Sequence, residues 1–194
     1  MSGRNCYQVA LLTGQSDPSQ WVLSPAQDTF LASIGVPPDC RVRLNFPYRE
    51  GSTDYRPAHL LEASLHNGAL YFRSRLRAFR QKHLTDVEAL IAAADRTVFL
   101  AGSCGLELFN NLRLRQSLLE RVSVFAFGPV ARGRPACAHL LVGGRRDPLS
   151  RWFFPRPDHL IDCGHLSYLS DPTLRTLCRG FVAETARAAR ETAP

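Results

Sequence analysis

Short apolar segments alternate with helical patterns along most of this 194-residue chain, and this alternation constrains the fold more than any other feature. Most of these segments are hydrophobic at nearly every position, which is typical of strands buried on both faces of a parallel sheet. Six segments fit this description: 7–13, 41–46, 97–102, 122–127, 138–144 and 159–164. The pattern predicts an α/β fold with a mostly parallel sheet of about six strands and helices on both faces.

The length and composition suit one compact domain. With 45% hydrophobic residues over 194 positions, the chain can bury a full core, and it is short for two domains. No low-complexity segment, block of like charges or fixed-period repeat divides it, so we expect a single domain over residues 1–194. Capping patterns indicate three helix starts, at Ser24 with Gln27, at Thr85 with Glu88, and at Asp171.

Six cysteines are spread along the chain without a CxxC pair, which predicts neither a structural zinc site nor a dense disulfide framework. The N-terminal residues lack the long apolar centre of a secretory signal. No segment approaches the roughly 18 uncharged apolar residues that a membrane span requires. We therefore expect a soluble cytoplasmic protein with reduced thiols, no membrane span, and no metal or organic cofactor.

The net charge of +7 raises the question of nucleic-acid binding, and the segment 73–83 is the richest in arginine. Between residues 61 and 79, apolar residues recur at three- and four-residue spacing, which predicts an amphipathic helix with the arginines in solvent. These apolar residues are Leu61, Leu65, Phe72, Leu76 and Phe79. Because no recognition motif accompanies the arginines, we expect no nucleic-acid partner.

The segment "TVFLAGSCGLELFNN", residues 97–111, contains two candidate nucleophiles, Ser103 and Cys104. A strand that passes through small residues directly into a helix is the setting of a nucleophile elbow. The same pattern also fits a tight strand-to-helix turn in which Ser103 only caps the helix.

Steric demands distinguish between the two candidates. The elbow is so sharp that the residues two before and two after the nucleophile must be small. Ala101 and Gly105 flank Ser103 in this way, whereas Cys104 would have Leu106 as its second neighbour. We therefore predict Ser103 as the nucleophile. The backbone N–H of Cys104 is then expected to face the developing oxyanion, at the positive end of the helix.

A nucleophilic serine needs a histidine base and a carboxylate that orients it, in the chain order Ser, Asp or Glu, His on this type of fold. Asp147 follows the segment 138–144, and His165 follows the segment 159–164. Active sites of open parallel sheets form at the carboxyl ends of the strands, so we expect these residues to meet Ser103 there. Singly, Asp147 also fits a turn or helix cap, and His165 also fits an ordinary loop residue.

At this point the chain resembles a small, lidless member of the α/β-hydrolase superfamily over nearly its whole length. The segment "LLVGGRRDPLS" is similar to the family's acid loop, "DCGHLSYL" to its histidine loop and "ALLTGQSD" to its oxyanion loop. The resemblance implies that Ser103, Asp147 and His165 form a catalytic triad. It also implies that the N–H of Gln15 is the second oxyanion donor, although Thr13 occupies the usual place of a histidine.

Aromatic residues follow each of the three loops, and we name Trp21, Trp152 and Tyr168 as candidate substrate-binding residues. They fit the core equally well. The segment 45–83 is longer than a simple crossover needs, and it is consistent either with an extra helix beside the site or with a helix packed on the sheet.

These observations predict a serine hydrolase, a carboxylesterase or acyl thioesterase, that cleaves its substrate through an acyl-enzyme. The expected partner is a small-molecule acyl ester or thioester. The positive charge of the chain suggests a substrate that is bound to an anionic carrier protein or to coenzyme A. The alternative is a non-catalytic protein of the same fold that binds a small ligand or a protein partner. The sequence specifies neither the acyl group, nor the leaving group, nor the oligomeric state.

Overall fold

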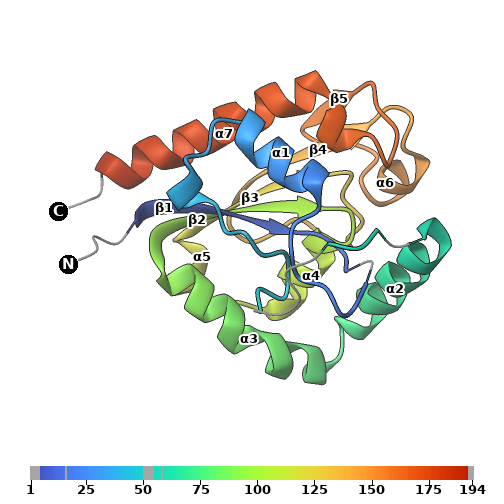
Figure 1. Ribbon diagram of the computed structural model, residues 1–194, viewed down its shortest axis with the longest axis horizontal. Coiled ribbons are helices and arrows are strands. Elements are labelled where there is room, and N and C mark those ends of the chain that lie inside the picture. The colour runs from blue at the N-terminus through green and yellow to red at the C-terminus, as the bar shows by residue number, and fades with distance from the viewer. Residues whose placement is uncertain (1–4, 16, 50–54, 58, 192–194) are drawn as a thin grey trace.

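The computed structural model describes residues 5–15, 17–49, 55–57 and 59–191, and its centre is a five-stranded, all-parallel sheet (Figure 1). The strands lie side by side in chain order: β1 (Asn5–Leu12), β2 (Ala94–Gly102), β3 (Val122–Phe127), β4 (Ala138–Gly144) and β5 (His159–Ile161). Because all neighbours are parallel, the five carboxyl ends share one edge of the sheet. The predicted α/β class with a mostly parallel sheet is confirmed.

Helices cover both faces of the sheet, as predicted. Figure 1 shows α1 and α7 on one side, and α3 and α4 on the other. The α-helices in the described residues are α1 (Pro25–Ser33), α2 (Leu60–Arg73), α3 (Arg77–Ala92), α4 (Gly105–Leu112), α5 (Gln116–Leu119), α6 (Pro148–Phe153) and α7 (Pro172–Glu191). Two short 3-10 helices lie at Pro38–Cys40 and Tyr168–Ser170.

The inner strands are apolar throughout because each of their faces packs into a core. In β1, Val9 and Leu11 contact the core that α1 and α7 close, and Ala10 and Leu12 contact the core that α3 and α4 close. All four are completely buried. Successive side chains of a strand point to opposite faces, so two covered faces require a continuous hydrophobic run.

Two of the three predicted helix caps are confirmed. The Ser24 hydroxyl accepts a hydrogen bond from the N–H of Gln27, and the Gln27 side chain accepts one from the N–H of Ser24. Asp171 accepts the N–H of Leu174 at 2.9 Å at the start of α7. The prediction for Thr85 is wrong, because α3 already begins at Arg77 and continues through that position.

The apolar stripe predicted between residues 61 and 79 does not form one buried face. The helical pattern is interrupted after Arg73 and resumes at Arg77, which gives the two helices α2 and α3. The break changes the direction of the chain, so Leu65, Phe72 and Leu76 are 73%, 64% and 59% exposed, while Phe79 is buried.

The predicted strand at 41–46 is also wrong. This segment makes a single parallel bridge, Arg41 to Val9, with a hydrogen bond of 2.9 Å from the N–H of Val42 to the carbonyl of Val9. It then pairs with the loop after β1 instead, through an antiparallel bridge from Leu44 to Val22 and a hydrogen bond of 2.7 Å from the N–H of Asn45 to the carbonyl of Trp21.

The connection between β3 and β4 is unusually short. Residues 128–137 join these two parallel strands with neither a helix nor a strand between them.

All six cysteines are free thiols. Among the helices of the described residues, none has the length and apolar character needed to cross a membrane.

Candidate active site

Ser103 lies at a sharp turn between β2 and α4, at the carboxyl edge of the sheet. Its φ angle is +52°, a left-handed conformation that non-glycine residues adopt at a cost. The N–H of Ser103 donates to the carbonyl of Phe127 at 3.1 Å, and its carbonyl accepts the N–H of Val130 at 3.0 Å. Hydrogen bonds to the neighbouring strand and the loop that follows it thus hold the turn in this strained geometry.

The turn requires small neighbours, which was the basis for choosing Ser103 over Cys104. A Cβ atom on Gly105 would lie 1.8 Å from the carbonyl oxygen of Leu12, and the position is therefore restricted to glycine. Two residues before Ser103, Ala101 is completely buried.

The Cys104 thiol is unsuited to nucleophilic chemistry. Its side chain is almost fully buried against Tyr71 and Val130. Burial raises the pKa of Cys104 to about 12, with a small further contribution from the charge of Glu107, so the sulfur stays protonated. The backbone of Cys104 lies at the N-terminus of α4.

His165 lies in the loop that follows β5, and its ring bridges Ser103 and Asp147. The Ser103 Oγ is 3.0 Å from His165 Nε2, and His165 Nδ1 is 2.8 Å from Asp147 Oδ2. The His165 side chain is 26% exposed, so a substrate in solvent can reach the imidazole. The three predicted residues thus meet in one continuous line of hydrogen bonds, although they come from three different strand ends.

Asp147 begins α6 and is completely buried. Its Oδ1 accepts the N–H of Ser150 at 3.0 Å, and its Oδ2 accepts both His165 Nδ1 and the hydroxyl of Tyr168 at 2.8 Å. Asp147 is therefore a helix cap as well as a hydrogen-bond partner of His165, and this geometry is compatible with both interpretations that the sequence left open. A Cβ on Gly144 would collide with the carbonyl of Cys163 at 2.4 Å, so the glycine lets the acid and histidine loops pack closely.

Tyr168, one of the three candidate substrate-binding residues, lies behind the site. Its ring is buried against Phe127 and its hydroxyl donates to Asp147. Burial, followed by the adjacent Asp147 carboxylate, raises the pKa of Tyr168 well above its usual range, so it remains a hydrogen-bond donor. No feature of the sequence distinguished this supporting position from a substrate contact.

The other candidate residues are dispersed. Trp152, on α6, is 84% exposed. Trp21 is half-buried and lines a cavity that it shares with Gln15, α2 and α3. The Gln15 side chain donates to the carbonyl oxygens of Pro18 and Gln20 at 3.4 and 3.2 Å, which fixes the loop after β1.

An extra helix does lie beside the site, and it is α2, from the long segment 45–83. The side chain of Asn67 contacts Gly14 of the loop after β1 so closely that a Cβ on this glycine would be 2.2 Å from Asn67 Oδ1. One turn further along, Tyr71 packs against Cys104 and stacks edge-on against Phe153 of α6. The sequence predicted the helix but gave no signal for Asn67.

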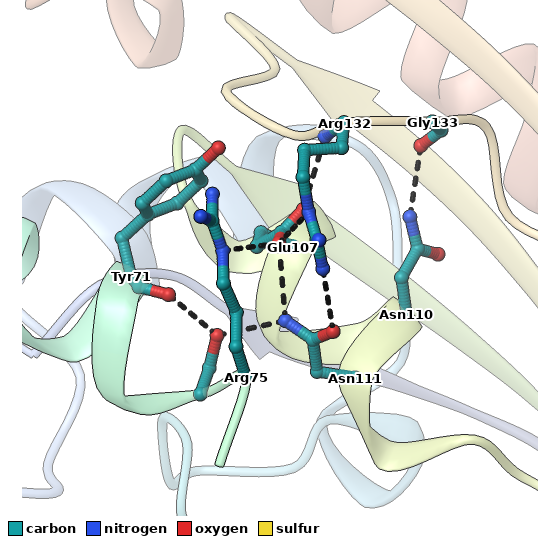
Figure 2. A network of polar contacts seen from close by, with 8 residues as sticks. Tyr71, Arg75, Glu107, Asn110, Asn111, Arg132 and Gly133 are labelled. Carbon is teal, nitrogen blue, oxygen red and sulfur yellow. Dashed lines mark hydrogen bonds and ion pairs between the residues drawn. The ribbon is translucent and has the colours of Figure 1, made fainter.

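A second buried carboxylate, Glu107, anchors the turn between α2 and α3 to α4 (Figure 2). Glu107 is 1% exposed and accepts the side chain and backbone N–H of Arg132 at 2.8 and 3.0 Å, Arg75 at 3.2 Å, and Asn111 at 3.1 Å. Burial alone would raise the pKa of Glu107, but the hydrogen bonds and the charge of Arg132 outweigh it and hold the pKa below its usual value. The network connects the turn between α2 and α3, α4 and the short β3–β4 connection, and no pattern in the sequence predicted it.

No cluster of three or more His, Cys, Asp or Glu side chains suited to a metal ion occurs among the described residues. The arrangement of the site is a serine at a strained turn, a histidine within hydrogen-bond distance, and a buried carboxylate that orients the histidine.

The sheet order, the helices on both faces and the turn at Ser103 define an α/β-hydrolase-like fold. A solved structure with the same architecture is that of the esterase PE8, with a TM-score of 0.51 and 15% sequence identity, over 95% of this chain and 94% of that one. At this level of identity the similarity shows the fold. No protein-family model matches the sequence, and no curated protein is significantly similar to it.

Proposed function

We propose that this protein is a serine hydrolase that cleaves a carboxylic ester or thioester through an acyl-enzyme. The observation that carries the proposal is the unbroken hydrogen-bond line from Ser103 through His165 to Asp147, at 3.0 and 2.8 Å. These are the distances and the order of contacts by which a base activates a serine and a carboxylate orients the base. The structural similarity to the esterase PE8 supports this reaction class.

In the proposed reaction, Ser103 Oγ attacks the acyl carbon while His165 Nε2 takes its proton. The N–H groups of Cys104 and Gln15 stabilise the oxyanion, helped by the positive end of α4. The C–O or C–S bond then breaks, and His165 returns the proton to the leaving group. Water, activated by the same imidazole, releases the acid from Ser103.

Asp147 has two functions in this proposal. It holds His165 in the tautomer that leaves Nε2 free to accept a proton, and its negative charge stabilises the imidazolium that forms. Tyr168 and the N–H of Ser150 occupy its other acceptor positions, so the carboxylate cannot rotate away from His165.

The excess of basic residues, 24 Lys and Arg against 17 Asp and Glu, suggests a substrate with negative charge, such as an acyl thioester on coenzyme A or an acidic carrier protein. The six free thiols are consistent with a reducing compartment, and we propose a cytoplasmic location.

A fluorophosphonate probe tests the reaction class, because it reacts covalently with an activated serine. We expect labelling of the wild-type protein and of Cys104→Ala, and none of Ser103→Ala. Labelling that persists in Ser103→Ala would show that another residue is the nucleophile. Folded wild-type protein that is not labelled would favour a non-catalytic ligand-binding protein instead. A panel of p-nitrophenyl esters and acyl thioesters of different lengths then identifies the acyl group.

A further inference from the structure

A cavity of about 310 Å³ lies next to the proposed active site, between α2, α3 and the two chain segments that contain Trp21 and Arg49. Ligand sites for small molecules typically begin at about 300 Å³. Gln15 is part of the cavity wall, and its backbone is also the proposed second oxyanion donor. The cavity therefore adjoins the reaction site without including Ser103 among its lining residues.

The inner part of the cavity is apolar and uncharged. Phe79 and His83 line it and are 6% and 7% exposed, with Leu70 and Trp21 beside them. The His83 ring lies 4.9 Å from the rings of both Phe46 and Phe79. Burial, followed by the positive charges of Lys82 and Arg49, lowers the pKa of His83 to about 4, so this wall is neutral at physiological pH.

The outer part of the cavity is cationic. Arg73 and Lys82 are exposed side chains of its lining, and within the described residues neither has a hydrogen bond or an ion pair. Arg49, also in the lining, is paired with Asp86 at 2.8 Å. No carboxylate is found among the described residues that line the cavity, and Asp86 offsets the charge of Arg49 but is paired with neither Arg73 nor Lys82.

We propose that this cavity binds a carboxylate with a short apolar tail, the tail against Phe79, Leu70 and Trp21 and the carboxylate at the Arg73 and Lys82 rim. An apolar interior favours burial of a hydrocarbon chain, and unpaired cations at the mouth select an anionic end group over a neutral or positive one. This inference deepens the proposed function and rests on it for the ligand's identity, because an acid with an apolar tail is what an acyl-ester hydrolase releases.

Trp21 provides a direct readout of binding. In a Trp152→Phe background it is the only tryptophan of the chain, and its emission is titrated with octanoate, 1-octanol and octyltrimethylammonium. We expect a saturable change with octanoate, and affinities lower by about tenfold or more for the other two compounds. The double change Arg73→Gln and Lys82→Gln should weaken octanoate binding by about tenfold and leave 1-octanol binding unchanged.

Arg77→Gln is the matched control, because Arg77 lies in the same basic segment, is exposed and does not line the cavity. It should bind octanoate like its parent. The inference is overturned if octanoate binds no more tightly than 1-octanol, or if Arg77→Gln weakens binding as much as the double variant.

The titration of the Trp152→Phe protein, run beside fluorophosphonate labelling of its Ser103, separates this inference from the proposed function. Octanoate binding without any reaction at Ser103 would support the binding site and refute the hydrolase. Reaction at Ser103 without selective octanoate binding would refute the binding site and leave the hydrolase standing.

Discussion

The protein contains two buried carboxylates at the carboxyl edge of its sheet, and their partners differ in kind. Asp147 and Glu107 are 0% and 1% exposed. Glu107 accepts hydrogen bonds from two arginines and the Asn111 amide, whereas Asp147 accepts from an imidazole, a phenol and a peptide N–H. Permanent cations neutralise Glu107, but no arginine or lysine is paired with Asp147 in the described structure.

This difference indicates two different uses of a buried negative charge. A buried carboxylate saturated by guanidinium groups is costly to disrupt, because losing its charge leaves the arginines without a partner, and it has little left to offer a reaction. A carboxylate whose strongest partner is a histidine can instead stabilise a positive charge when that histidine takes a proton. We therefore expect changes at Asp147 to affect turnover and changes at Glu107 to affect stability.

The largest expected effect is at Asp147. Asp147→Asn should lower kcat for ester hydrolysis by about 10⁴-fold, the size of effect known for this change in a Ser-His-Asp triad, because an amide can hold the wrong tautomer of His165. The free energy of unfolding should change far less, since Asn also caps helices well. Steady-state kinetics and urea unfolding measure the two quantities.

Asp162→Asn is the control for this prediction, because Asp162 lies near His165 in the chain but is 75% exposed and paired only with an exposed arginine. It should leave both quantities nearly unchanged. Near-normal turnover of Asp147→Asn would mean that Asp147 is only a cap.

The contrast between these carboxylates also explains what the sequence could and could not predict. Asp147 follows a glycine pair at the end of an apolar strand, and loops at strand ends are local features that a linear pattern reveals. Glu107 sits inside the amphipathic pattern of α4, and its partners Arg75 and Arg132 are 32 and 25 positions away. Nothing local marks such a contact.

The errors in the predicted fold have the same origin. The segment 41–46 alternates like a strand, but after its bridge to β1 its backbone pairs with Trp21 and Val22 of the loop that follows β1, a contact that alternation does not encode. The stripe from Leu65 to Leu76 has helical spacing, but its burial depends on the change of direction after Arg73, which spacing does not encode.

Glu107→Gln should give the next largest effect, a loss of about 2–3 kcal/mol in the free energy of unfolding. The amide keeps the shape of the side chain but loses the charge-assisted hydrogen bonds from Arg75 and Arg132. Both arginines are partly exposed, at 31% and 57%, so solvent can hydrate them and limit the cost. Urea unfolding measures the change.

The rate of fluorophosphonate labelling, measured well below the melting temperature, should stay close to that of the wild-type protein in Glu107→Gln. Glu184→Gln, at an exposed position of α7, serves as the matched control for stability. If Glu107→Gln were as stable as this control, the network in Figure 2 would not contribute to the fold.

A smaller effect is expected at Tyr168, which supports Asp147 from behind. Tyr168→Phe removes one hydrogen bond to the carboxylate and keeps the ring against Phe127, so we expect about a tenfold lower kcat with little change in KM. Steady-state kinetics measure kcat and KM separately.

Tyr7→Phe, at the other end of the sheet in β1, is the control for Tyr168→Phe. It should leave kcat and KM unchanged. A kcat of Tyr168→Phe equal to that of the wild-type protein would show that this tyrosine contributes to packing only.

The smallest effect is the pH dependence of stability that Glu107 confers. Because the folded state holds the pKa of Glu107 below its usual value of 4.5, the unfolded chain takes up a proton first as the pH falls. The contribution of Glu107 to the free energy of unfolding is therefore fully present above about pH 4.5. It is lost as the pH falls through the lowered pKa of Glu107 in the folded protein. In urea unfolding between about pH 5 and pH 3, the free energy of unfolding should fall more steeply for the wild type and for Glu184→Gln than for Glu107→Gln. Only Glu107→Gln lacks the carboxyl of Glu107 that titrates in this range. Other acidic groups titrate alike in all three proteins, so their contribution cancels in the comparison. Parallel curves for all three would mean that the arginines around Glu107 stabilise its charge no better in the folded protein than water does in the unfolded chain.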